Sequence, residues 1–218
     1  QMCHVRNLFQ FVDDTLAKEQ LAWLEGVLHR AQGNNERVLI TGHIPPGMFG
    51  GCWGRASKEY ELLLFKYKGA LAGQVFGHQH SGSFRLLREE AAYLGAPFAV
   101  AHITPALSPY NGGNPTFRTY TVGPTPEASF DVVDFQQFFL QLHEYDSSSS
   151  ALSKSQPLKW HLGYSPRYTF NVTDMSAKGW QQLRDSFDAD QAVKNRYLTA
   201  ERSSRKWQGP GEAGDYMC

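Results

Sequence analysis

Two short apolar runs in this chain each end in a glycine followed by a histidine. The run 37–41 is followed by His43, and the run 71–76 is followed by His78 and His80. Alternate side chains of an extended segment point to the same side, so we expect His78 and His80 to reach one site. Neutral imidazole is the commonest protein ligand of zinc and similar metals. The three histidines are therefore candidate metal ligands, although a His-x-His sequence taken alone is more often an ordinary surface feature.

The hydrophobic pattern indicates which elements would position these histidines. Apolar residues at helical spacing predict an amphipathic helix over 16–31, and a second helix is expected over 57–67. Each helix precedes one of the apolar runs, and the first run is typical of a buried strand. In α/β folds the carboxyl ends of such strands open onto the crevice where ligands bind. The pattern therefore predicts an α/β fold with the histidines at the ends of its strands.

The rest of the chain is expected to close this sheet with short antiparallel strands and then to add helices. A Ser-rich segment, 146–156, is interpreted as a linker or surface loop. Trp23 and Phe117 are among the aromatic residues that we assign to the core. The expected strands are 83–87, 98–103 and 117–122, and the expected helices are 135–145, 176–187 and 189–202.

Composition limits the classes of partner. The 218 residues are 41% hydrophobic, which is enough for one sizeable domain with a packed core. Lys plus Arg (21) balance Asp plus Glu (21), so no net positive field favours a nucleic acid polymer. No apolar stretch approaches the roughly 20 residues that a membrane helix needs. We therefore expect neither a nucleic acid polymer as partner nor a transmembrane segment.

Read together, these motifs resemble the calcineurin-like metallophosphoesterases. Within that family the resemblance is strongest to acid sphingomyelinase and the acid sphingomyelinase-like phosphodiesterases, and it extends over 11–168 in order. It implies that the chain is the C-terminal half of a metallophosphoesterase β-sandwich flanked by helices, with a small helical C-terminal appendage. The segments that carry the resemblance are 20–25, 38–47, 73–80, 104–110, 114–118 and 160–164.

The resemblance also implies a dinuclear zinc site and a reaction. It assigns His43 and His78 to one metal and His80 to the other, and it places Tyr110 on the substrate side of the cleft. Two metals about 3.5–4 Å apart can bind both the attacking and the leaving oxygen at phosphorus, and a bound water then loses its proton near neutral pH. The expected activity is hydrolysis of a small phosphodiester, such as a nucleotide or a phospholipid headgroup.

The family's remaining ligands lie in Asp-x-His, Gly-Asp-x-x-Asp and Gly-Asn-His motifs that precede the matched region, and this sequence contains none of them. The catalytic histidine is expected in that upstream part as well. We therefore expect the chain alone to be inactive, with an N-terminal half of the same protein supplying the Asp, Asn and His ligands. On this interpretation 1–145 is the half-domain, 146–156 the linker and 157–218 a partly helical extension. The alternative is a non-catalytic binding or structural protein that retains the fold.

The sequence also suggests roles for several other residues. Trp53, on a Gly-rich loop after His43, is expected either to contact substrate or to pack. His102 is expected either to support a metal ligand from behind or to be structural, and Arg118 either contacts a phosphate or is solvated or salt-bridged. In some relatives a cysteine in the His43 loop forms a disulfide, which makes Cys3 and Cys52 a possible pair, with free thiols as the alternative. Asn171-Val172-Thr173 is a glycosylation sequon and, with the resemblance, favours a secreted or lysosomal protein.

Overall fold

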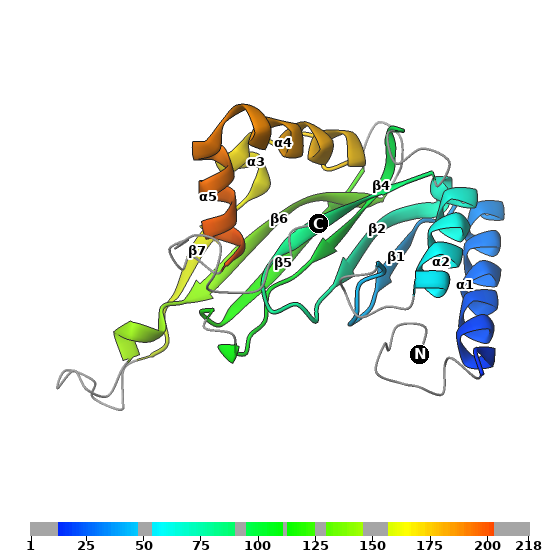
Figure 1. The fold of residues 1–218 in the computed structure, drawn as a ribbon, viewed down its shortest axis with the longest axis horizontal. Helices are drawn as coiled ribbons and strands as arrows, with labels where there is room; N and C mark the ends of the chain where they lie inside the picture. The colour runs from blue at the N-terminus through cyan, green and yellow to red at the C-terminus, as the bar shows by residue number, and fades with distance from the viewer. Residues whose placement is uncertain are drawn as a thin grey trace.

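The computed structural model describes residues 13–47, 54–89, 95–110, 113–124, 130–145 and 157–202. The strands are β1 (Val38–Thr41), β2 (Leu71–Phe76), β3 (Ser83–Arg88), β4 (Pro97–Ile103), β5 (Thr116–Gly123), β6 (Asp131–Leu140) and β7 (Trp160–Tyr164). They form a four-stranded sheet of order β1-β2-β4-β3 and a three-stranded sheet of order β5-β6-β7 (Figure 1). The pairs β1–β2 and β2–β4 are parallel and the other pairs are antiparallel. The expected mixed α/β fold is confirmed.

Two helices cover one face of the four-stranded sheet, α1 (Thr15–Gly33) and α2 (Gly54–Lys66) (Figure 1). Leu21, Leu24 and Leu28 repeat at helical spacing along α1 and are buried. They join one core cluster with Leu64 of α2 and Phe76 of β2. This packing holds the two helices against the strands that lead to His43 and His78.

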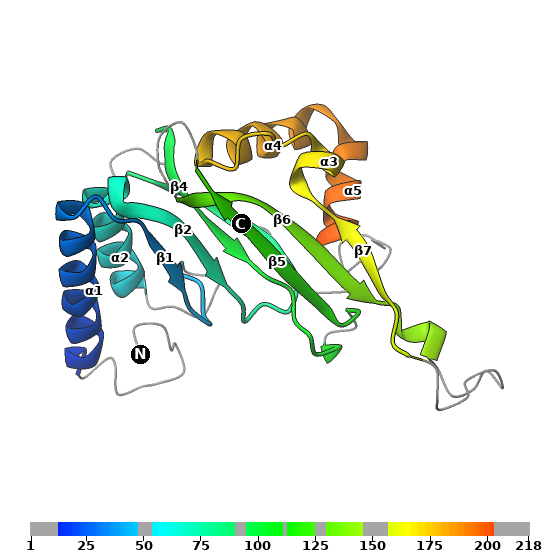
Figure 2. The ribbon, with the colours of Figure 1, turned by 180° about the vertical axis from the view of Figure 1, so that it is seen from behind.

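The second sheet and three further helices lie over the other face of the four-stranded sheet (Figure 2). The sheets approach closely where β2 meets β6, because a Cβ at Gly73 would lie 2.8 Å from Val132 Cγ2. Helices α3 (Pro166–Phe170), α4 (Ala177–Ala189) and α5 (Gln191–Glu201) enclose a second core cluster that includes Phe135 and Trp180. The segment 146–156 lies outside the described residues, so a domain division there stays a prediction.

The helix expected over 135–145 is wrong. Asp131–Leu140 is β6, the central strand of its sheet, and a short 3-10 turn, Leu142–Tyr145, follows it. Phe135 and Gln137 are fully buried while Gln136 between them is exposed, which is the alternation of a strand. The local sequence fits a helical pattern and a strand pattern almost equally well. Pairing with β5 on one side and β7 on the other decides for the strand.

Two further expectations about burial are corrected. Trp23 lies on the outer face of α1 and is 66% exposed, and Phe117 on β5 is 36% exposed, so neither belongs to the buried core. The strand β1 is not fully buried, because its side chains alternate between half-buried and exposed. Among the described residues β1 is an edge strand with a neighbour only on its β2 side, which explains its exposure.

A buried ion pair joins α5 to the second sheet. Arg118 Nη2 on β5 lies 2.6 Å from Glu201 Oε2, and the two side chains are only 1% and 4% exposed. Arg118 Nε donates to Gln137 Oε1 at 2.8 Å and its Nη1 donates to the Ile103 carbonyl at 3.2 Å. The Tyr164 hydroxyl donates to the other oxygen of Glu201. Arg118 is therefore a salt-bridged core residue, and its burial leaves it no access to a phosphate.

None of the helices in the described ranges combines the length and the hydropathy needed to cross a membrane.

Candidate metal centre

His43 and His78 meet at the carboxyl ends of two adjacent parallel strands. The backbone pairing of β1 and β2 continues past the strand ends, since Gly42 N donates to the Val75 carbonyl at 3.0 Å and Gly77 N donates to the His43 carbonyl at 2.9 Å. Both imidazoles are exposed, and their ring centroids lie 5.2 Å apart at an interplanar angle of 79°. The fold thus brings together two histidines that are 35 positions apart in the sequence (78 minus 43).

The separation of these two rings suits a shared metal ion. Each ligating nitrogen of a zinc site lies about 2.0–2.1 Å from the metal, so two imidazoles on one tetrahedral zinc have ring centres about 5 Å apart. The observed 5.2 Å between His43 and His78 is in that range. The pair therefore fits two of the four positions around a zinc ion.

His80 lies beside this pair in a different environment. It is half-buried, and its Nδ1 atom is buried without a hydrogen-bond partner in the described part of the chain. Its ring centroid is 5.6 Å from that of Tyr110, which is 70% exposed. A buried, unpartnered imidazole nitrogen costs free energy unless it binds something, which is consistent with a ligand position.

The described residues do not complete a metal site by themselves. Nowhere within them do three or more His, Cys, Asp or Glu side chains gather closely enough to hold a metal ion. The grouping of His43, His78 and His80 around metals therefore stays a prediction. A carboxylate ligand of the kind expected from upstream motifs would have to come from outside the described part of the chain.

The segment that carries His78 and His80 is not extended as we expected. Both residues have positive φ, 74° at His78 and 62° at His80, in the left-handed region that residues other than glycine seldom adopt. The two side chains therefore reach their positions through a tight bend and not through strand alternation. Such strain persists only where the surroundings impose it, and it is commonly found at functional sites.

We expect this strain to be visible in the stability of matched variants. His80→Gly should be about 1 kcal/mol more stable than His80→Ala, because glycine carries no Cβ penalty in the left-handed region. At His43, where φ is not positive, the glycine variant should be no more stable than the alanine variant. Thermal unfolding of the four variants with chelator present measures both differences. Equal stabilities at position 80 would show that the bend is unstrained.

Side chains that the sequence analysis missed hold the His43 loop in place. Arg85 Nη1 on β3 donates to the Pro46 carbonyl at 2.7 Å and pairs with Glu61 Oε1 at 2.7 Å. The amide of Gly47 donates to Ser57 Oγ at 2.8 Å. Arg85 is 39 residues from Pro46 in the sequence, and no local motif marks the contact. The loop after β1 is thus fixed from both β3 and α2.

Other predicted site residues are placed as follows. Trp53, Cys3 and Cys52 lie outside the described residues, so substrate contact and the disulfide remain predictions. Asn171 is exposed at the end of α3. Tyr110 lies next to His80, as a residue on the substrate side of a metal centre would, but its role is likewise still a prediction.

His102 lies in the core between the sheets and α4. Its ring centroid is 5.1 Å from that of Trp180, 5.9 Å from that of Phe135 and 6.1 Å from that of Tyr120. Burial, together with the positive charge of Arg118, lowers the pKa of His102 from 6.5 to about 3. The imidazole is therefore neutral in the folded protein throughout the range in which an ordinary histidine titrates.

The lowered pKa of His102 predicts a loss of stability in acid. Below pH 6.5 the unfolded chain binds a proton at His102 that the folded chain does not bind. The contribution of His102 to the free energy of unfolding therefore falls as the pH decreases from 6.5 toward 3. The slope approaches 1.36 kcal/mol per pH unit. Urea unfolding at pH 7.5 and pH 4.5 should therefore show about 2–3 kcal/mol less acid loss for His102→Phe than for the wild type. His29→Phe, on an exposed part of α1, is the control; equal acid loss in all three proteins would contradict the prediction.

Comparison with known proteins finds several phosphodiesterases that are similar to this chain. No family model matches the chain. Sphingomyelin phosphodiesterase of Bos taurus is 31% identical over 83% of this chain and 28% of its own length. Acid sphingomyelinase-like phosphodiesterase 3b of Homo sapiens is 31% identical over 82% of the chain and 40% of its own length. Cyclic GMP-AMP phosphodiesterase SMPDL3A of Homo sapiens is 27% identical over 80% of the chain and 39% of its own length.

The chain thus spans only 28–40% of the length of these three relatives. The similarity agrees with the family resemblance that the motifs alone suggested. Over the region that they cover, the matches assign the chain to the family of the acid sphingomyelinases and acid sphingomyelinase-like phosphodiesterases.

Proposed function

We propose that this chain supplies the second half of a dinuclear zinc centre in a phosphodiester hydrolase, and that it is inactive without an N-terminal half of the same protein. The observation that carries the proposal is the position of His43 and His78 at the ends of adjacent strands, with their ring centroids 5.2 Å apart. The relatives support the reaction class, because all three named above are phosphodiesterases.

Within this proposal each residue has a distinct task. His43 and His78 would hold one zinc ion and His80 would hold the other, so all three would act as ligands and not as bases. When bound, the zinc pair polarises the phosphoryl oxygens and lowers the pKa of a bound water toward ~7. Tyr110, exposed beside His80, presents its hydroxyl to the substrate, and the Arg85 contact with Pro46 keeps the His43 loop from moving.

The open edge of β1 supports a missing partner segment. Parallel sheets are normally covered on both faces, and the unpaired backbone groups of an edge strand can accept a further strand. Among the described residues β1 and β3 are the two edges of this sheet, and β1 is the edge beside the histidines, with Leu39 38% exposed. An N-terminal half that adds strands at this edge would pair the free backbone groups and bring carboxylate ligands to the same end of the sheet.

The substrate class follows from chemistry that the relatives share. One relative's name gives sphingomyelin as its substrate and another's gives cyclic GMP-AMP, and both are phosphodiesters. We propose a small phosphodiester of this kind, a nucleotide or a phospholipid headgroup, as the substrate. We further propose that the protein is secreted or lysosomal.

The test compares the full polypeptide with the present chain. Zinc content and hydrolysis of bis-p-nitrophenyl phosphate are measured for both, before and after treatment with a chelator. We expect two zinc ions and chelator-sensitive turnover for the full polypeptide, and no turnover for the chain alone. A full polypeptide that folds but contains neither zinc nor activity would favour the alternative, a non-catalytic binding or structural protein that kept the fold.

A further inference from the structure

The sequon at 171–173 lies in an accessible turn. Asn171 ends α3 in the left-handed conformation, with φ 56° and ψ 32°, and both Asn171 and Thr173 are exposed. Asparagine is, after glycine, a common residue at such a helix end, so the local fold alone explains Asn171. The helix end does not account for Thr173 two residues later, so the Asn-x-Thr spacing needs a separate explanation.

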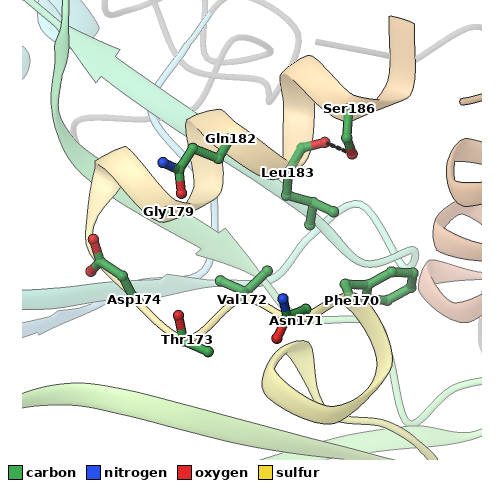
Figure 3. Close-up of a pocket in the computed structure, with 9 residues that line it drawn as sticks. All are labelled: Phe170, Asn171, Val172, Thr173, Asp174, Gly179, Gln182, Leu183 and Ser186. Carbon is green, nitrogen blue, oxygen red and sulfur yellow. Dashed lines mark hydrogen bonds between the residues drawn. The ribbon is translucent and has the colours of Figure 1, made fainter. Parts of the chain in front are cut away.

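A hollow opens directly beside Asn171. It has a volume of about 150 Å³ and lies between the 170–174 segment and α4 (Figure 3). Gly179 allows the close approach of these segments, since a Cβ there would lie 1.8 Å from the Asp174 carbonyl oxygen. Its lining combines apolar and polar side chains, which suits a ring with both C–H and hydroxyl groups. The lining includes Phe170, Val172, Leu183, Gln182 and Asp174.

An exposed aromatic residue precedes the sequon. Tyr168 is 83% exposed, whereas Tyr164 and Tyr197 of the second core cluster are buried. Tyr168 lies on α3 three residues before Asn171, the residue that caps this helix. The apolar C–H face of a sugar packs well on an aromatic ring whose hydroxyl edge stays in water.

We propose that Asn171 carries an N-linked glycan whose first N-acetylglucosamine packs on Tyr168 and covers the hollow between α3 and α4. The donor is a lipid-linked oligosaccharide pyrophosphate. The amide nitrogen of Asn171 bonds to C1 of the first sugar, the bond from C1 to the pyrophosphate oxygen breaks, and the amide gives up one proton as the lipid pyrophosphate leaves. The proposal rests on the export that forms part of the proposed function, and not on the metal centre.

The first experiment tests the site itself. The full polypeptide is purified after secretion from cultured eukaryotic cells, and its peptides are analysed by mass spectrometry. We expect the peptide containing Asn171 to carry N-acetylhexosamine, while Asn114, whose sequon is blocked by Pro115, stays unmodified. Thr173→Ala should abolish the modification and Thr173→Ser should retain it. An unmodified Asn171 in the secreted wild-type protein would overturn the proposal.

The second experiment tests the packing of the sugar. Trimming the glycan to one N-acetylglucosamine should leave the Tm unchanged, and complete enzymatic removal should lower it by about 2–4 °C. This decrease should disappear in Tyr168→Ala and persist in Arg167→Ala, a neighbouring exposed position on the same helix. A decrease of the same size in both variants, or none in the wild type, would overturn the packing. Zinc content and hydrolysis are measured separately on the same preparation, so failure of the hydrolase proposal would be recognised independently.

Discussion

Arg118→Ala is expected to lower the free energy of unfolding by about 3–5 kcal/mol, because it leaves the Glu201 carboxylate buried without its partner. Burial is the largest single effect and disfavours the charge on Arg118, but the Glu201 carboxylate together with Tyr164 and Tyr120 outweighs it and raises the pKa of the guanidinium above its ordinary value. The guanidinium also lies 4.3 Å from the centroid of the Phe135 ring, so its replacement removes packing as well as charge.

The comparison variants separate the charge from the packing. Glu201→Ala should cost a similar amount, whereas the apolar double replacement Arg118→Met with Glu201→Leu should cost clearly less, because no unpaired charge remains. Lys18→Ala, which removes an exposed pair with Asp14, should change stability by about 0–1 kcal/mol. Urea unfolding measures all four variants. If Arg118→Ala cost no more than Lys18→Ala, the buried pair would be unimportant to the fold.

His78→Ala in the full polypeptide is expected to remove at least one zinc ion and to lower hydrolysis of bis-p-nitrophenyl phosphate by more than about 100-fold. Changes to groups that merely support a metal ligand cost about 10–100-fold, so loss of a ligand itself should cost more. His43→Ala should have the same effect because its ring pairs with that of His78.

Two measurements accompany these variants. His29→Ala, which removes an exposed histidine on α1, should retain full zinc content and activity. Thermal unfolding with chelator present should show that His78→Ala folds, so that lost activity reflects the metal and not the fold. Wild-type zinc content in both His78→Ala and His43→Ala would remove these residues from the metal centre.

The parts of the fold that the sequence could predict are those in which neighbouring residues decide the outcome. The strand expected over 71–76 matches β2 residue for residue, because an apolar run bounded by glycines admits few alternatives. The helix predicted over 135–145 is wrong because Phe-Gln-Gln-Phe-Phe-Leu, at 135–140, satisfies a helical pattern as well as a strand pattern, and pairing with β5 and β7 decides for the strand. The prediction that Trp23 is buried is wrong because burial depends on which element packs against a given face of the helix, and helical spacing does not reveal that.

The candidate site likewise combines features that the sequence predicts with features that it does not. Gly-His at the end of each strand placed His43 and His78 near one another, since adjacent parallel strands end at one edge. The left-handed bend at His78 and His80 had no local signal, because it is imposed by surrounding structure. The contact of Arg85 with Pro46 and that of Arg118 with Glu201 span 39 and 83 residues, beyond the reach of any pattern in one sequence.

The docking of α5 has a consequence for the loop that carries His78 and His80. Gly82, two residues after His80, donates its amide to the Glu201 carbonyl at 2.8 Å, and a Cβ at Gly82 would collide with the Glu201 carboxylate. The start of β3 and the end of α5 are therefore tied although 119 residues separate them (201 minus 82). By reciprocity of linked equilibria, any ligand that orders this loop also favours the docked helix, and detaching the helix weakens that ligand's binding by the same factor.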